Sequence, residues 1–148
     1  MTDPRDRDPR DLYREHILEH SKHPRSEGRL EGHTHAHTES NPLCGDRVTV
    51  QLVLDGEGRI EDLRFKARGC AISVAAVSMM TEWVRGLGPG ELAHLRAQVS
   101  DAVPPGGPEV PPPVDALVAL RAFPTRERCA TLAWDTLLAA LDHPVNAQ

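Results

Sequence analysis

The sequence predicts an α+β fold, in which a compact antiparallel β-sheet of about three strands has helices packed against it. Two segments that alternate apolar and polar residues, 48–54 and 60–67, are joined by the turn sequence Asp-Gly-Glu-Gly at 55–58, a pattern typical of a β-hairpin. Segments with helical spacing come before and after this hairpin, not between its strands. Elements that are segregated in this way favour an α+β domain over an alternating α/β one.

The first element expected is a helix over residues 9–22. Asp8 is a suitable N-cap, Pro9 fits the first helical position, and Pro24 ends the helix. The charged residues 1–8 that precede it are expected to form a disordered tail.

A histidine-rich segment comes next. Residues 33–39 read His-Thr-His-Ala-His-Thr-Glu, so a strand here would place His33, His35 and His37 on one face. Such a row could bind a metal, although a solvated strand face is the more common outcome. A strand at residues 33–39 would form an antiparallel meander with the two hairpin strands. The last strand of this meander has an irregular step at residues 61–62.

Helices follow the sheet. They are expected at residues 71–85, 90–99, 114–122 and about 126–142. Gly86 is expected to end the first of them, because glycine commonly follows the last residue of a helix. The proline-rich residues 103–113 can form neither a helix nor a central strand and are expected to be an exposed loop. We therefore expect one domain over residues 9–142 and a C-terminal tail at 143–148.

The composition excludes several classes of function. The 148-residue chain has a formal net charge of −5, whereas dedicated nucleic-acid binders are usually basic. No run of about eighteen apolar residues could form a transmembrane helix, and residues 1–10 do not resemble a secretory signal. Neither a nucleic-acid nor a membrane partner is expected. An odd number of cysteines without a signal predicts reduced thiols and a cytoplasmic location.

The three cysteines lie at the ends of predicted elements. Cys44 is in the turn before a strand, Cys70 lies just before a helix, and Cys129 is in the first turn of the last helix. Helix N-termini favour anions and lower thiol pKa values, so Cys70 and Cys129 are candidate thiolates. The cysteine spacings match no zinc-finger pattern, and free cysteines that only fill the core are the plain alternative.

Asp46 adds a fourth candidate ligand. In Cys44-Gly45-Asp46 an extended backbone points residues two apart to the same side, and the glycine lets the backbone approach a bound atom. Together with Cys70 and Cys129, this pair supplies three sulfurs and one oxygen for a tetrahedral ion. Zinc accepts this set, and iron–sulfur chemistry also favours thiolates. An aspartate that only caps the turn is the alternative.

These residues belong to longer segments that resemble a known family. The segments are residues 12–20 with 23–25, 41–46 (Asn-Pro-Leu-Cys-Gly-Asp), 69–73 (Gly-Cys-Ala-Ile-Ser) with 78–80, and 128–134 (Arg-Cys-Ala-Thr-Leu-Ala-Trp). In this order they resemble the IscU/NifU N-terminal family of iron–sulfur cluster assembly proteins, and specifically its SufU branch.

The resemblance implies a SufE/NifU-like fold in which Cys44, Asp46, Cys70 and Cys129 converge at one exposed end and hold Zn²⁺. It implies a partner, a pyridoxal-phosphate-dependent cysteine desulfurase of the SufS type, which passes persulfide sulfur to one of the thiols. Cys44, in the glycine-flanked segment, is the expected acceptor. A SufBCD-type complex is a candidate downstream scaffold. Residues 86–113 correspond to an insertion of SufU proteins. The chain would be a sulfurtransferase-like persulfide carrier and not a stand-alone enzyme.

Two other functions remain open for the same four side chains. They could carry a nascent [2Fe–2S] cluster, in which case the protein is a scaffold that hands the cluster on. They could also hold a purely structural zinc in a binding module, although a chain of this length does not need a metal to stabilise its fold.

The resemblance also has departures. IscU-type proteins have a histidine just before the last cysteine, where this chain has Arg128, so Asp46 would have to complete the ligand set. They also have a Leu-Pro-Pro-Val-Lys chaperone-binding motif, which residues 122–127 do not reproduce. Arg126 and Arg128 flank Cys129 and could lower thiol pKa values or meet a partner; a plain surface role is the alternative.

The remaining candidates favour packing roles. His16 and His20 are one helical turn apart, which would suit a metal, but a docked helix face is the preferred interpretation. Met79 and Met80 are expected in the core, and Trp83 and Trp134 are expected to be packing residues.

Overall fold

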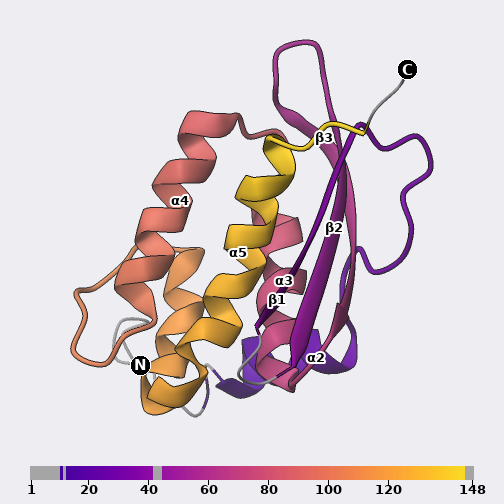
Figure 1. Ribbon diagram of the computed structural model, residues 1–148. Coiled ribbons are helices and arrows are strands. Elements are labelled where there is room, and N and C mark those ends of the chain that lie inside the picture. The colour runs from indigo at the N-terminus through magenta and orange to yellow at the C-terminus, as the bar shows by residue number, and fades with distance from the viewer. Residues whose placement is uncertain (1–10, 12, 42–44, 146–148) are drawn as a thin grey trace.

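Three antiparallel strands form one layer of the molecule, in the spatial order β1-β2-β3 (Figure 1). The computed structural model describes residues 11, 13–41 and 45–145. β1 is His35–Asn41, β2 is Asp46–Leu54 and β3 is Ile60–Arg68. The predicted α+β fold, with helices packed on a three-stranded antiparallel sheet, is confirmed.

The strand boundaries refine the prediction at two places. β1 begins at His35, so His33 precedes the strand and does not belong to it. The irregular step predicted at residues 61–62 is a β-bulge, because the register between β2 and β3 shifts between Val53 and Leu54.

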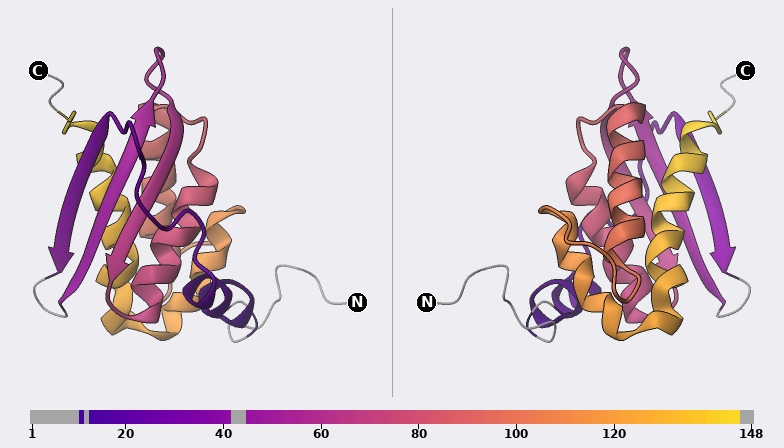
Figure 2. Two further views of the ribbon diagram at one scale, coloured as in Figure 1. Left: turned by 90° about the vertical axis from the view of Figure 1, so that its right-hand side faces the viewer. Right: turned by 90° about the vertical axis from the view of Figure 1, so that its left-hand side faces the viewer.

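The two faces of the sheet have different surroundings. The face toward the helices is apolar and buried, with Val48, Val50, Leu52, Leu63 and Phe65. The helices α3 (Ala71–Trp83) and α5 (Glu127–Leu141) lie on this side (Figure 2). The opposite face is polar, and the chain that follows α2 crosses part of it, where the Leu30 N–H donates a hydrogen bond to Gln51 Oε1 over 2.9 Å.

The N-terminal helix differs in detail from the prediction. Tyr13–Leu18 forms a π-helix, in which the backbone hydrogen bonds span five residues, and Glu19–Lys22 continues it as α2. Ile17 and His20 are buried on its inner side. The predicted tail at residues 1–8 lies outside the described residues.

The later helices agree with the predicted positions. α4 is Pro89–Ala102, and residues 103–113 form neither helix nor strand. The segment Val114–Ala122 is a 3₁₀-helix (η3) and is followed by a second short one, Pro124–Arg126 (η4). Prolines on both sides keep this region short, and short helices often adopt the tighter 3₁₀ geometry.

The end of the described chain lies beside β1. The Val145 N–H donates to the Thr34 carbonyl oxygen over 2.7 Å, and the Ala36 N–H donates to the His143 carbonyl oxygen over 3.2 Å. The domain limits and the insertion at 86–113 stay predictions. In the part of the chain that is described, no helix is both long and apolar enough to cross a bilayer.

Candidate metal centre

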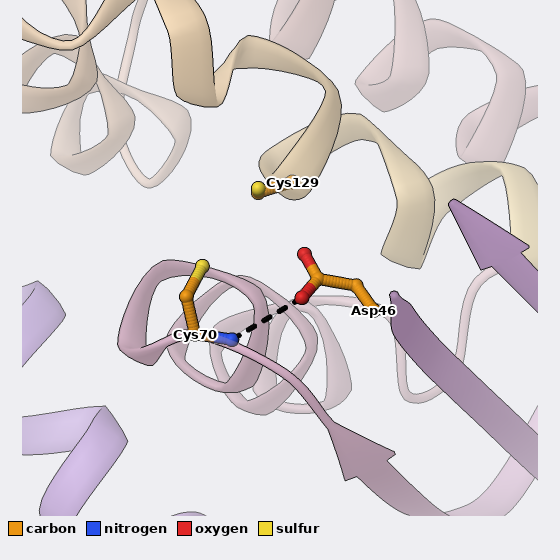
Figure 3. Close-up of side chains that lie close together, drawn as sticks. All are labelled: Asp46, Cys70 and Cys129. Atoms are coloured by element: carbon orange, nitrogen blue, oxygen red, sulfur yellow. Dashed lines mark hydrogen bonds between the residues drawn. The ribbon is translucent and has the colours of Figure 1, made fainter. Parts of the chain in front are cut away.

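Three of the four predicted ligands meet at one end of the sheet. Asp46 is the first residue of β2, Cys70 is the N-cap of α3, and Cys129 lies in the first turn of α5. One ligand atom from each lies within 4.8 Å of the others (Figure 3). Cys44 lies outside the described residues, so its predicted role as a ligand and sulfur acceptor stays a prediction.

The spacing of the three ligand atoms can be compared with a zinc site. With Zn–S bonds of about 2.3 Å, the ligand atoms of a tetrahedral site are about 3.7 Å apart. The upper limit of 4.8 Å found here is only slightly wider. Small side-chain rotations would bring Asp46, Cys70 and Cys129 to such spacings, and two thiols with a carboxylate are donors that zinc accepts. The residues present therefore fit this metal.

The Asp46 carboxylate is held by the start of α3. Its Oδ1 accepts a hydrogen bond from the Cys70 N–H over 3.3 Å, and its Oδ2 accepts one from Ser73 Oγ over 2.5 Å. Asp46 is 2% exposed and Ser73 is fully buried. A helix N-terminus stabilises a negative charge, so the fold fixes this carboxylate where a cation could bind.

Ser73 is the site residue that the sequence did not identify as functional. It is the third residue after Cys70, a position whose side chain returns to the helix N-terminus. Its Oγ lies 3.6 Å from Cys70 Sγ and also donates to Asp46. The spacing of Cys70 and Ser73 was a usable signal, because a side chain three places after an N-cap tilts back toward the N-terminus of the helix.

Gly69 allows Asp46 and Cys70 to approach one another. A Cβ atom at position 69 would lie 2.3 Å from Asp46 Oδ1. No side chain tolerates that distance from a carboxylate held by two hydrogen bonds. The Gly-Cys pair at the end of β3 therefore has a steric function as well as a chemical one.

The pKa values of the two thiols are shifted in opposite directions. Burial disfavours the Cys70 thiolate, but backbone and side-chain hydrogen bonds from Ser73, and a hydrogen bond from Cys129, outweigh it and lower the pKa of Cys70. For Cys129, burial, the hydrogen bond with Asp46 and the charge of Cys70 raise the pKa to about 12. The expectation that both helix N-termini lower the thiol pKa is thus right for Cys70 and wrong for Cys129, because burial and the interactions with Asp46 and Cys70 dominate there.

The two arginines that flank Cys129 have different partners. The interaction of the Arg126 guanidinium with Cys129, followed by the charges of Cys70 and Cys129, raises the pKa of Arg126. Arg128 forms an ion pair with Asp135 at 2.5 Å, and Asp135 also binds Arg96 at 3.1 Å. Arg126 is therefore the arginine that interacts with the candidate centre, whereas Arg128 forms an ion pair within α5.

The histidines do not gather into a second centre. His33 Nδ1 lies 2.8 Å from the Leu30 carbonyl oxygen, and His37 Nε2 lies 2.8 Å from Glu39 Oε1. Within residues 11, 13–41 and 45–145, the group Asp46–Cys70–Cys129 is the one set of three or more potential ligands close enough to share an ion. The metal-binding alternative for the histidine row receives no support.

The packing interpretations hold for the other candidates. His20 is buried, and its Nδ1 lies 2.7 Å from Ser78 Oγ in α3. Met79 and Met80 are in the core. The rings of Trp83 and Trp134 are in contact, with centroids 6.2 Å apart.

The fold and the Cys/Asp group together define a small α+β protein with a thiol-rich site at one end of its sheet. The model of the NifU-like N terminal domain matches residues 12–101. The iron–sulfur cluster assembly scaffold protein IscU of Streptococcus pyogenes serotype M1 is 37% identical and aligns with 93% of this chain and 87% of its own. The zinc-dependent sulfurtransferase SufU of Bacillus subtilis is also 37% identical, over 85% of this chain and 86% of its own.

Solved structures give the same result. A structure from Fervidobacterium islandicum, described as a candidate iron–sulfur cluster assembly scaffold of the SUF system, has a TM-score of 0.77 and 29% identity and covers 88% of this chain and 97% of its own. The chain belongs to the NifU-like N-terminal family of iron–sulfur cluster assembly proteins, to which IscU and SufU also belong.

Proposed function

We propose that this protein is a zinc-dependent sulfur relay, which accepts persulfide sulfur from a pyridoxal-phosphate-dependent cysteine desulfurase of the SufS type. The observation that carries the proposal is the meeting of Asp46, Cys70 and Cys129 within 4.8 Å. The similarity to a relative named as a zinc-dependent sulfurtransferase supports the choice of metal and reaction. Cys44 completes the proposed ligand set.

The proposed metal has one chemical effect here: zinc bound by Cys44, Asp46, Cys70 and Cys129 keeps the thiols deprotonated at neutral pH. Asp46 is suited to this ligand set because two hydrogen bonds already orient its carboxylate. Its partner Ser73 acts as a support of the kind that orients ligands in metal sites.

Cys44 is the proposed acceptor. Its thiolate attacks the outer sulfur of the donor's persulfide, so that a new S–S bond forms on Cys44 while the donor's S–S bond breaks and its cysteine thiolate leaves. This exchange needs no external oxidant or reductant. Cys70 and Cys129 are less suited to the role, because α3 and α5 hold them and Cys129 is only 2% exposed.

Arg126 is a proposed electrostatic support for the reaction. It is exposed, and its interaction with Cys129 raises its pKa. A guanidinium at this position favours the anionic sulfur species that arrive and leave. Arg128, which is paired with Asp135, is not free for that role.

The test is persulfide transfer from a SufS-type desulfurase to the zinc-loaded protein, measured by mass spectrometry of the acceptor. The unaltered chain should gain one sulfur on Cys44, and Cys44→Ser should gain none. Transfer that persists in Cys44→Ser would remove Cys44 from this role. A SufBCD-type complex is the proposed recipient of the sulfur.

A second candidate function is a scaffold for a [2Fe–2S] cluster. It is favoured by the similarity to IscU of Streptococcus pyogenes, which is named as a scaffold. Metal analysis and an absorption spectrum of untagged protein purified without air distinguish the two. About one zinc per chain with no visible absorbance supports the relay. Iron with matching sulfide and a visible band supports the scaffold.

A further inference from the structure

A group of basic side chains lies on the sheet face that points away from the helices. Strand alternation places Arg47, Lys66 and Arg68 on this face, and all three are exposed. Arg47 directly follows Asp46, and Arg68 is two residues before Cys70. The three residues, which we call the basic patch, therefore lie at the end of the sheet that carries the candidate centre.

The basic patch contains an unfavourable pair. Arg47 and Arg68 are direct partners across β2 and β3, and like charges directly opposite one another destabilise a sheet. No residue in the described part of the chain forms an ion pair with Arg47, Lys66 or Arg68. By contrast, Arg64 on the same face is neutralised by Asp62 at 2.7 Å. Among the described residues, this repulsion at the end that carries the candidate centre is therefore not offset by an ion pair.

Within the described residues, the segment that follows α2 covers part of this face and reaches the edge of the basic patch. Ser26 and Gly28 form backbone hydrogen bonds with Phe65 (3.0 and 2.9 Å), and the segment then crosses toward β1 (Figure 2, left). Between this segment and the basic patch is a shallow hollow of about 100 Å³. Arg29 and Lys66 both line it, so the positive charge extends to the edge of the crossing segment.

We propose that the basic patch is a docking surface for an acidic region of the cysteine desulfurase that supplies sulfur to the centre. This inference rests on the proposed function. A donor that reaches the centre must approach the end of the sheet where Arg47 and Arg68 lie. The chain carries a net charge of −5, so an acidic partner is attracted at this local cluster and repelled elsewhere, which fixes its orientation as well as its affinity.

The test is the rate of association between the zinc-loaded protein and a SufS-type desulfurase, measured by stopped-flow fluorescence at several salt concentrations. Arg68→Glu should slow association at least about tenfold at low salt and weaken its salt dependence. Because this change converts the like-charge pair with Arg47 into an opposite-charge pair, the melting temperature should not fall. Lys66→Glu, further from the ligands, should act in the same direction.

The matched control is Arg59→Glu, the same charge change at the far end of the sheet. Arg59 is exposed and pairs with Glu57 and Glu91, and its variant should associate at the normal rate. Zinc content is measured for every variant, so that damage to the centre is seen separately.

Three results would overturn the proposal. The first is equal association rates for Arg68→Glu, Lys66→Glu and Arg59→Glu. The second is normal desulfurase binding with lost affinity for a duplex oligonucleotide or for phosphate, which would assign the basic patch to another anion. In both cases persulfide transfer to Cys44 could still proceed, and the proposed function would stand. The third is no desulfurase binding by the unaltered chain, in which case the proposed function fails as well.

Discussion

Two sets of potential metal ligands can be compared in the described part of this protein, and the ligand atoms of one set converge. The histidines at residues 33–37 are close in sequence, and each described ring has a local partner, such as Leu30 for His33 and Glu39 for His37. Asp46, Cys70 and Cys129 are far apart in sequence, yet their ligand atoms lie within 4.8 Å. Period-two spacing aligns the histidines along one strand, whereas Asp46, Cys70 and Cys129 come from three elements whose ends meet.

The largest expected effect is on zinc binding when a member of the Cys/Asp group is removed. Cys70→Ala or Cys129→Ala should lower zinc affinity by more than about 100-fold, the upper end of the effect of outer-shell partners. His35→Ala and His37→Ala should leave it unchanged. A competition titration with a chromogenic chelator measures all four. A zinc affinity that falls in the histidine variants would show that the histidines also bind the metal.

The next effect comes from the close approach at Gly69. Gly69→Ala places a Cβ atom 2.3 Å from Asp46 Oδ1, so the carboxylate or the strand end must move. Overpacking of this kind costs about 1–3 kcal/mol of folding free energy, and zinc affinity should fall with it. Urea denaturation with and without zinc measures both quantities.

Gly56→Ala is the control for Gly69→Ala. A Cβ atom at Gly56, in the hairpin turn, meets nothing within 4 Å. This variant should keep the normal stability and zinc affinity. Equal behaviour of the two variants would show that the approach at Gly69 has no role in holding Asp46.

A smaller effect on zinc affinity distinguishes a serine that holds the candidate centre from a serine that only stabilises the core. Ser73→Ala removes the hydrogen bond to Asp46 Oδ2 and should lower zinc affinity by about tenfold. Ser78→Ala is the matched control, because Ser78 is also fully buried in α3 but contacts His20 and the Arg25 N–H instead. It should lower the folding stability with no change in zinc affinity. Loss of zinc affinity in both variants would indicate a general effect of loosening α3.

Much of the fold follows from local patterns. The alternation of β2 and β3 and the turn at 55–58 are enough to predict the hairpin, and Pro24 and the proline-rich residues 103–113 mark where helices cannot be. The 3₁₀ geometry of Val114–Ala122 and the π-helix at Tyr13–Leu18 were not predicted. The helix types differ in residues per turn, but segments of six and nine residues are too short for the hydrophobic pattern to separate them.

Three of the four predicted ligands lie together in the candidate site, but the electrostatics of the site was not predicted. The sequence shows that Cys70 and Cys129 start helices, and a helix N-terminus alone would lower both thiol pKa values. The pKa of Cys129 is raised to about 12 by burial, Asp46 and Cys70. That result depends on which charges lie together in space. The same is true of Arg126 and Arg128, which look equivalent in sequence and have different partners.

The smallest expected effect is on the pH dependence of folding stability and concerns His20, which is buried against α3. Burial, followed by the charge of Arg25, lowers the pKa of His20 below the ordinary value of 6.5. The folded protein therefore binds fewer protons at His20 than the unfolded chain does. The stabilisation is fully present above pH 6.5 and is lost as the pH falls below 6.5 toward the folded-state pKa, with a slope of at most about 1.4 kcal/mol per pH unit.

His20→Gln should flatten this acid-side loss of stability, and His94→Gln, at an exposed position on α4, should not. Melting temperatures between pH 5 and pH 8 in the zinc-free protein measure the difference without involving the metal. If His20→Gln loses stability at acid pH as steeply as the unaltered chain, another group causes the loss. A flattened profile would separate two roles of histidine in this fold: His20 is buried against α3, whereas His37 of β1 pairs with Glu39 and stacks on His143.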